Sequence, residues 1–221
     1  MLLQATTVQI TRTESALDIL LKGGWILIPL FLLSIVAIYF IIERYTLYRS
    51  YRHIDTTLIE RIRKAIYAGD FRQVQQLASN YDHPIGRIIA AGLENPNRPI
   101  NDIEQIMTDQ SKTEVFLMEK NLGYIGSIAT IAPMFGFLGT IFGVIKIFYN
   151  ISLADNISIG IIAGGLYQKM VSSAVGLTIG ILAYAGFYYL NTQIDRITNN
   201  MEVQLNKVLL ALKDYKNCLN C

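Results

Sequence analysis

Three long apolar stretches alternate with charged segments along this chain of 221 residues. The stretches cover residues 23–42, 123–148 and 159–190, and the first contains no Asp, Glu, Lys or Arg. A helix needs about 20 apolar residues to cross the ~30 Å hydrocarbon core of a bilayer, and each stretch is about that long or longer. The pattern therefore predicts an all-α membrane protein with three transmembrane helices, and no segment has the alternation of a β-strand.

The remaining segments complete the predicted organisation. They are an N-terminal periplasmic or interfacial amphipathic segment at 1–22, a cytoplasmic helical domain at 43–122, a periplasmic hairpin at 149–158, and a cytoplasmic C-terminal helix and tail at 191–221. Arg44, Arg49 and Arg52 follow the first stretch, whereas Lys22 alone precedes it. By the positive-inside rule the N-terminus lies outside and the C-terminus inside.

Helix breakers divide the cytoplasmic domain. Because no Gly or Pro lies between Glu43 and Lys64, the first helix is predicted to continue to about Lys64. Shorter helices and a loop are predicted at 71–80, 84–94 and 95–99. A further helix, capped by Asn101–Asp102, is predicted from Ile103. With no breaker before the second apolar stretch, it is expected to enter the bilayer without a joint.

Small and polar residues follow one face of the second and third stretches. They are Gly126, Ala129, Pro133, Gly136, Thr140 and Gly143 on the second, and Gly165, Gln168, Lys169, Ser172, Ser173, Gly176, Gly180 and Ala183 on the third. At ~100° per residue each set forms a stripe along a helix. Lipid offers no partner to a hydroxyl, an amide or an ammonium, so such a stripe should face protein or water. We interpret the two stripes as part of an ion-conducting assembly.

Close helix packing is predicted at Pro133, Gly136, Gly139, Gly143, Gly165 and Gly176. The hydroxyls of Thr140 and Ser173 have two interpretations at this point. They line an ion path, or they stabilise helix contacts through hydrogen bonds worth ~0.6–2 kcal/mol each.

Composition excludes several function classes. The chain is 52% hydrophobic and 16% charged, with a net charge of +2 and no basic block that would indicate nucleic acid. Cys218 and Cys221 form a single CxxC without the second pair that a zinc site needs, which favours an inert tail over metal or redox chemistry, and we predict no metal site. No phosphate-binding glycine loop, HExxH motif or nearby histidine for Ser172 and Ser173 is present, so we predict no enzyme and no cofactor. The N-terminus lacks a basic region and a cleavage site, and no cleaved signal peptide is expected.

Two segments carry a family resemblance. Ala132–Gly143 (APMFGFLGTIFG) resembles the "APLLGLLGTVxG" signature of the ExbB/TolQ/MotA proton-channel family, and Gly165–Leu177 is similar to its third-helix "GIxEALxxTAxGL" signature. Asp82–Leu93 and Glu114–Leu122 also resemble family segments, so the likeness spans nearly the whole chain. Three spans rather than four favour the ExbB and TolQ branch over the flagellar stator.

The resemblance implies a multi-pass protein of the bacterial inner membrane that forms a ring, pentameric in the family, with the second and third helices around a lumen. It implies an ExbD-like single-span partner in that lumen, which carries a protonatable aspartate, and a TonB-like protein that spans the periplasm. The implied function is a proton-channel subunit that couples proton motive force to TonB-dependent import across the outer membrane. The alternatives are a TolQ-type subunit of the Tol-Pal envelope system and a non-conducting membrane scaffold.

The family's second-helix threonine maps onto Thr140 and its third-helix threonine onto Ser173. The predicted pore-lining residues are Thr140, Ser173, Gln168, Lys169 and Ser172. Gln168 stands where most members have a glutamate, and a glutamine cannot titrate. No Asp or Glu lies between Gly123 and Tyr149 or between Asn156 and Asn191, so any essential carboxylate must come from the partner.

Lys169 is the most costly residue of the predicted spans. It lies ~15 Å along the third helix at 1.5 Å per residue, too far from the end for easy snorkelling. Its burial costs about 2.5–3.5 kcal/mol or more without a partner or water. Two interpretations remain open: a lumenal lysine that acts on the partner's carboxylate, or an interface lysine bonded to a neighbouring subunit.

Overall fold

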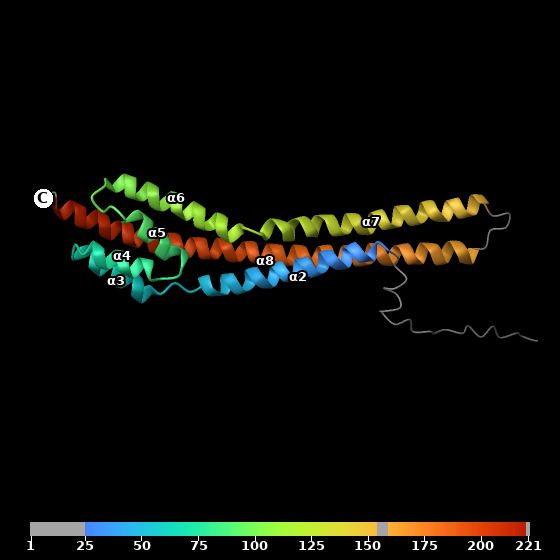
Figure 1. The fold of residues 1–221 in the computed structure, drawn as a ribbon, viewed down its shortest axis with the longest axis horizontal. Helices are drawn as coiled ribbons and strands as arrows, with labels where there is room; N and C mark the ends of the chain where they lie inside the picture. Colours follow the sequence, from blue (N-terminus) through green and yellow to red (C-terminus); the bar gives the residue numbers. More distant parts are fainter. Residues whose placement is uncertain (1–24, 154–158, 220–221) are drawn as a thin grey trace, which may run out of the picture. The chain divides into compact units, whose positions relative to one another are not determined.

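The computed structural model describes residues 25–153 and 159–219, all of whose regular structure is helical. The helices are α2 (Leu27–Tyr51), α3 (Thr56–Tyr67), α4 (Phe71–Ser79), α5 (Pro84–Gly92), α6 (Ile100–Glu119), α7 (Leu122–Leu153) and α8 (Ile159–Leu219), shown in Figure 1. The all-α prediction is therefore confirmed for the described residues. The predicted segment at 1–22, residues 154–158 of the predicted hairpin and Cys221 lie outside them.

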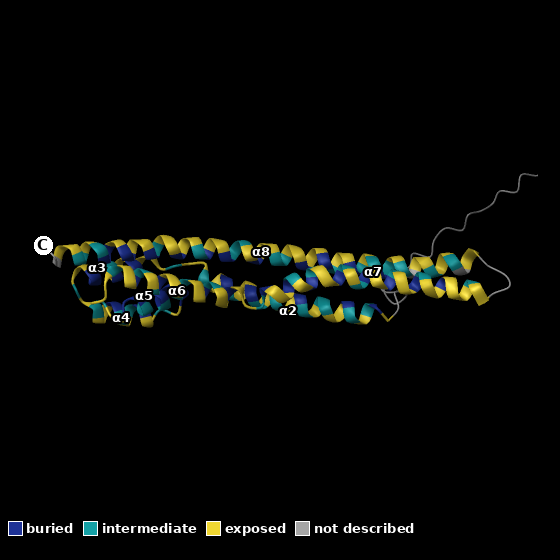
Figure 2. Cartoon of the chain, turned by 90° about the horizontal axis from the view of Figure 1, so that it is seen from above, coloured by how far each residue is buried: buried dark blue, intermediate teal, exposed yellow. Residues whose placement is uncertain are grey.

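Three helices, α2, α7 and α8, are long and apolar enough to cross a membrane, which confirms the three predicted spans. Large apolar side chains such as Phe31, Met134 and Leu182 are more than three-fifths exposed on them. Exposed positions recur along these helices in Figure 2. An apolar surface of this extent is stable only against lipid or other protein, so the chain is a membrane protein.

The contacts divide the chain into two compact units, Met1–Val36 with Ile128–Ala183, and Ala37–Ser127 with Tyr184–Cys221. The first unit contains the candidate functional site. The second contains α3 to α6 and the end of α8, packed around Ile66, Ile88 and Ile103, none of which is exposed.

Ion pairs join the helices of the second unit. Arg87 on α5 donates from Nε and Nη2 to the buried carboxylate of Glu114 on α6, at 2.9 and 2.7 Å. This bidentate hydrogen bond raises the pKa of Arg87. Lys213 near the end of α8 pairs with Glu104 on α6 at 2.9 Å. The end of α8 buries one apolar stripe, as its periodicity predicts: Ile194, Ile197, Met201, Leu205, Val208 and Leu212.

The prediction that the first helix continues to about Lys64 is wrong. Helix α2 ends at Tyr51, and Asp55 starts α3 as an N-cap whose carboxylate accepts from Thr57 N at 2.9 Å and Leu58 N at 3.3 Å. A helix can therefore end without Gly or Pro where a side chain accepts hydrogen bonds from the first backbone N–H groups of the next helix. The predicted start of the following helix at Ile103 is also wrong, because α6 begins at Ile100 directly after Pro99.

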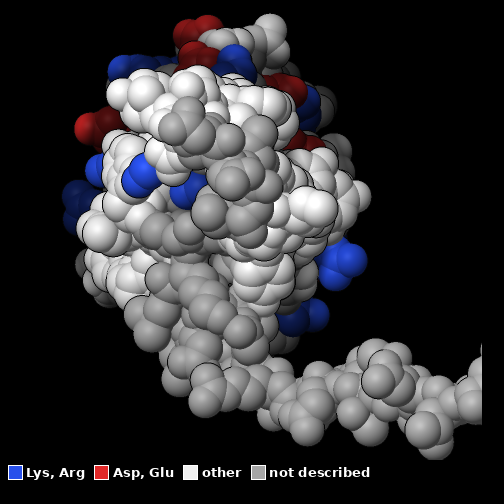
Figure 3. Space-filling view, turned by 90° about the vertical axis from the view of Figure 1, so that its right-hand side faces the viewer, with Lys and Arg blue, Asp and Glu red and all other residues white. Residues whose placement is uncertain are grey.

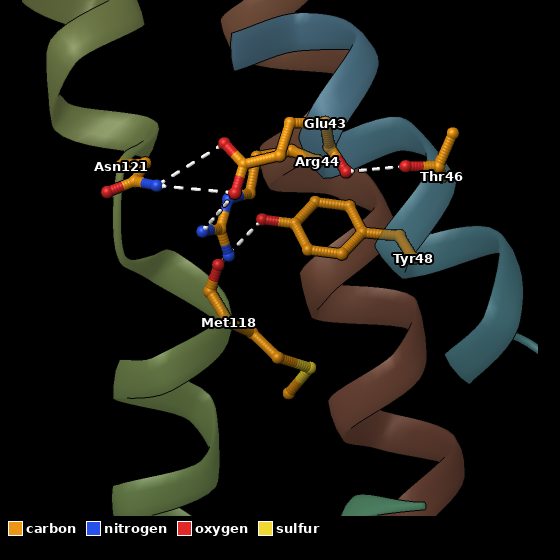
Figure 4. Close-up of polar contacts among 6 residues, drawn as sticks. All are labelled: Glu43, Arg44, Thr46, Tyr48, Met118 and Asn121. Carbon is orange, nitrogen blue, oxygen red and sulfur yellow. Dashed lines mark hydrogen bonds and ion pairs between the residues drawn. The ribbon is translucent and has the colours of Figure 1, made fainter.

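The expected continuous helix from Ile103 into the bilayer is broken at Lys120–Asn121. Asn121 has a φ of 72°, a left-handed conformation that asparagine tolerates better than most residues. The Met118 carbonyl would accept from Leu122 N in an unbroken helix; here it accepts from the Tyr48 hydroxyl at 2.7 Å. Asn121 Nδ2 donates to Glu43 Oε2 at 3.3 Å, so side chains of α2 bind both sides of the joint (Figure 4).

Removing the Tyr48 hydroxyl should destabilise this joint. Tyr48→Phe leaves the buried Met118 carbonyl without its partner, at a cost of about 1–3 kcal/mol. We expect a lower midpoint of thermal unfolding and faster amide exchange at residues 118–122. Tyr45→Phe is the matched control, because Tyr45 is 45% exposed and its hydroxyl donates no hydrogen bond within the described chain. Equal effects of the two variants would contradict the assigned role.

His83 links the end of α2 to the start of α5. It is 2% exposed, its Nδ1 accepts from Ile85 N at 3.2 Å, and its Nε2 lies 3.0 Å from the Tyr51 carbonyl. This pattern requires a neutral ring with the proton on Nε2, since a proton on Nδ1 would remove the cap of α5. Burial lowers the pKa of His83 below its ordinary value.

The second unit should therefore lose stability in mild acid. The unfolded chain takes up the His83 proton as the pH falls through about 6.5, whereas the folded chain takes it up only at lower pH, so stability falls with pH in this window. His83→Gln keeps a donor and an acceptor but cannot titrate. We expect its thermal unfolding midpoint to change less than that of the wild type between pH 7.5 and 5.5. Identical changes would show that other groups cause the acid sensitivity.

Candidate functional site

The antiparallel helices α7 and α8 approach each other closely enough for backbone contact. A Cβ added to Gly136 would lie 3.2 Å from Gly176 Cα and from Ser172 O, and one added to Gly176 would lie 2.7 Å from Ala132 O. No side chain fits between the helices at these points. Small residues that allow such close approach are the main source of helix association in a membrane. We call this contact the α7–α8 seam.

The seam extends beyond these two glycines. A Cβ on Gly165 would lie 2.7 Å from Ile147 Cδ1, and one on Gly180 would collide with the Pro133 ring. A Cβ on Gly143 would collide with the aliphatic stem of Lys169. The structure thus brings all six residues predicted to pack closely into the seam. Pro133 lies inside α7 without ending it.

One flank of the seam is covered by the turn that leads into α2. Ile26, which is 4% exposed, lies against Gly139, where an added Cβ would be 3.0 Å from Ile26 Cγ2 and also 3.0 Å from Ser172 Oγ. Ser172 is completely buried here and donates to the carbonyl of Lys169 at 2.8 Å. These contacts favour a packing role for Ser172 over a pore-lining one.

Thr140 and Ser173 lie on the other flank. Each is one residue, or ~100°, further along its helix than Gly139 or Ser172. Because α7 and α8 are antiparallel, this rotation turns both side chains toward the same side, away from Ile26. Both residues are partly exposed. The structure therefore brings together the two hydroxyl residues on the flank that α2 leaves open.

The two hydroxyls differ in what they can offer a ligand. Thr140 Oγ1 donates to the Phe137 carbonyl at 2.6 Å, so its remaining capacity is as an acceptor. Within the described chain the Ser173 hydroxyl makes no hydrogen bond, and it can both donate and accept. Such a pair can bind water or a hydronium ion but cannot itself exchange a proton near neutral pH.

An open apolar groove of about 720 Å³ includes this flank. Pro133, Phe137 and Leu177 are among its lining residues, and Ser173 contributes its only polar side chain. One chain cannot enclose an ion path here, because the groove is open along its length. A closed path needs further copies or a partner.

Lys146 and Lys169 are the only charged residues of α7 and of residues 159–190 of α8. Seen toward the hairpin end of α7 and α8, the described surface is mostly uncharged (Figure 3). Lys169 is partly exposed. Gln168 lies in α8, and its side chain is outside the described ones.

Sequence reasoning missed two groups of residues. Lys146 is exposed on α7 one turn beyond Gly143, and its charge within an apolar helix was a direct signal. The second group is the polar cluster at the joint. Arg44 there is only 6% exposed and pairs with Glu43 at 3.1 Å. From the sequence it was interpreted only as a positive charge that sets the orientation of the first span in the membrane.

Comparison with known proteins identifies the class. The profile of the MotA/TolQ/ExbB proton channel family matches residues 80–203, more than half of the chain and including the whole α7–α8 seam. The chain belongs to this family.

Individual relatives fall in two branches. The chain is 24% identical over 163 residues to the ExbB-like protein 3 of Synechocystis, covering 73% of this chain and 78% of that protein. It is also 24% identical over 120 residues to the biopolymer transport protein ExbB of Neisseria gonorrhoeae, 54% of each chain. The Tol-Pal system protein TolQ of Haemophilus influenzae is 24% identical over 106 residues, 47% of this chain and 46% of that protein.

Substitution in the seam should separate α7 from α8. Gly176→Ala places a methyl group 2.7 Å from the Ala132 carbonyl oxygen and 2.8 Å from Gly136 Cα, so we expect a loss of about 1–3 kcal/mol from overpacking. Gly164→Ala is the matched control on the same helix, because nothing lies within 4 Å of its added Cβ. Its effect should be neutral or slightly stabilising. Thermal unfolding in detergent measures both, and equal midpoints would argue against the seam.

Proposed function

We propose that this chain is the channel subunit of an ExbB-type complex in the bacterial inner membrane, which couples proton movement to TonB-dependent import across the outer membrane. In this proposal several copies, five by family resemblance, form a ring whose lumen is lined by the open flank of the α7–α8 seam. A single-span ExbD-like protein occupies the lumen, and a TonB-like protein receives the motion.

The observation that carries this proposal is the placement of Thr140 and Ser173 on one open flank of a seam made of backbone contacts. A rigid seam fixes the two hydroxyls relative to each other. Ser173 is the polar group that can hold water in the otherwise apolar groove, and Thr140 lies beside it on the same flank. The chain's own spans lack a carboxylate, so the protonatable group belongs to the lumenal partner.

The resemblance to TolQ supports a second candidate, a subunit of the Tol-Pal system. The chemistry within the membrane would be the same, and only the periplasmic partner would differ. Affinity purification of the chain from its own cells, followed by mass spectrometry of the captured proteins, separates the two: TonB-like protein supports the first candidate and TolA-like protein the second. Native mass spectrometry of the same sample gives the subunit count.

Conduction should depend on the two hydroxyls. Thr140→Val is nearly isosteric, and together with Ser173→Ala it removes both water-binding groups while the seam stays intact. We expect an assembled ring whose proton flux falls by at least about tenfold, consistent with the loss of buried hydrogen-bonding groups. The measurement is the quenching of a pH-sensitive dye in proteoliposomes that hold the chain with its co-purified single-span partner.

Thr178→Val provides the control, because Thr178 is an exposed hydroxyl on α8 that donates to its own helix at Ala174 O. It should conduct like the wild type. Normal flux in the assembled Thr140→Val, Ser173→Ala variant would exclude the lumen assignment. An absence of flux in the wild-type complex would instead favour a scaffold that conducts nothing.

A further inference from the structure

Lys169 is held in a defined position by the α7–α8 seam. Its Cγ, Cδ and Cε atoms occupy the space that a side chain at position 143 would take, and Gly143 is buried beneath them. A lysine stem that packs on a glycine loses much of its rotational freedom. The ammonium is therefore restricted to few positions.

The level of Lys169 along the seam follows from its place on α8. Ser173 lies four residues further on, about one helical turn along the same face. Thr140 lies three residues before Gly143 on the facing helix. The stem of Lys169 is thus within about one helical turn of both hydroxyl residues along the seam.

The depth of Lys169 excludes lipid headgroups as its partner. It is ten residues into α8, which begins at Ile159, so it lies ~15 Å along the helix axis from that end. A lysine side chain reaches only about 6 Å, too little to reach the interface by snorkelling. A charge at this depth needs a partner inside the hydrocarbon region.

The chain's described spans supply no such partner. The Lys169 ammonium makes no hydrogen bond or ion pair with the residues that the structure describes. The other ionisable residues of segments 128–153 and 159–183 are Lys146, Tyr149 and Tyr167, and none is a carboxylate. Residues 25–42 of α2 contain no charged group.

We propose that the Lys169 ammonium, positioned by Gly143, is a binding site for a carboxylate on a membrane-spanning helix of another protein. This inference rests on the proposed function, because it takes that helix to be the lumenal partner. Lys169 binds the ionised carboxylate and thereby fixes the height and rotation of the partner helix. Protonation of the carboxylate weakens the pairing, so each proton that binds releases the helix from this position.

A chemical cross-link tests the contact without any need for conduction. Dicyclohexylcarbodiimide activates membrane-buried carboxylates as O-acylisoureas, and an adjacent lysine amine then displaces the urea to form an amide. In the complex of the chain with its co-purified single-span partner, we expect this amide between Lys169 and the partner, identified by peptide mass spectrometry. Lys169→Met should abolish it and Lys146→Met should leave it intact. A cross-link from Lys169 to a second copy of this chain, or none at all, would overturn the proposal.

Proton flux tests the consequence. Lys169→Met keeps the apolar stem on Gly143 but removes the charge, so the partner carboxylate holds its proton more tightly. The pH midpoint of flux should rise by at least about one unit, the usual effect of losing an opposite charge within ~4–6 Å. Lys169→Arg should stay near the wild type, and so should Lys146→Met, because Lys146 lies beyond Gly143 on α7, away from Thr140.

The outcomes separate the two proposals. A wild-type complex without flux rejects the proposed function, while the cross-link still decides the role of Lys169. A wild-type complex that conducts, with an unshifted midpoint in Lys169→Met, rejects the electrostatic role of Lys169 and leaves the channel assignment standing.

Discussion

The backbone contact between Gly136 and Gly176 is the constraint on which the first unit, here called the membrane unit, depends. Lipid gives no hydrophobic driving force between helices, so α7 and α8 are held together by van der Waals contact at short range. Such an approach leaves no room for side chains in the seam itself. Every functional group must therefore lie on a flank. The glycines thus determine the distance between the helices and also place Thr140 and Ser173 at fixed positions beside the contact.

Much of this arrangement could be predicted from the sequence, because small residues at helical spacing are a direct sign of close packing. Hydropathy likewise predicted three spans, which the structure has. The side of the seam that each hydroxyl faces could not be predicted. Ser172 and Ser173 are neighbours in sequence, yet one is fully buried and the other partly exposed. Contact with Ile26, in the turn before α2 and far away in the sequence, decides the difference, and no local pattern contains that information.

The helix ends of the second unit were harder to predict for a related reason. A search for Gly and Pro found no break at Arg52–Asp55 or at Lys120–Asn121. The first break has a local signal, the capping carboxylate of Asp55. The second depends on groups far away in the chain, since Tyr48 replaces the lost helical donor at Met118, 70 residues along. Breaks of this kind depend on tertiary contacts, and helix propensity alone does not predict them.

The charges of the membrane unit favour assembly over an isolated chain. Lys169 lies ten residues into α8, about 15 Å along the axis, too deep for its side chain to reach that end of the helix. An unpaired ammonium at that depth costs at least about 2.5–3.5 kcal/mol, a large part of the net stability of a typical domain. A carboxylate or water brought by a partner lowers this cost only in the complex. The same residue that destabilises the free subunit therefore contributes to the affinity and the register of its partner, which explains how a charge at this depth is tolerated.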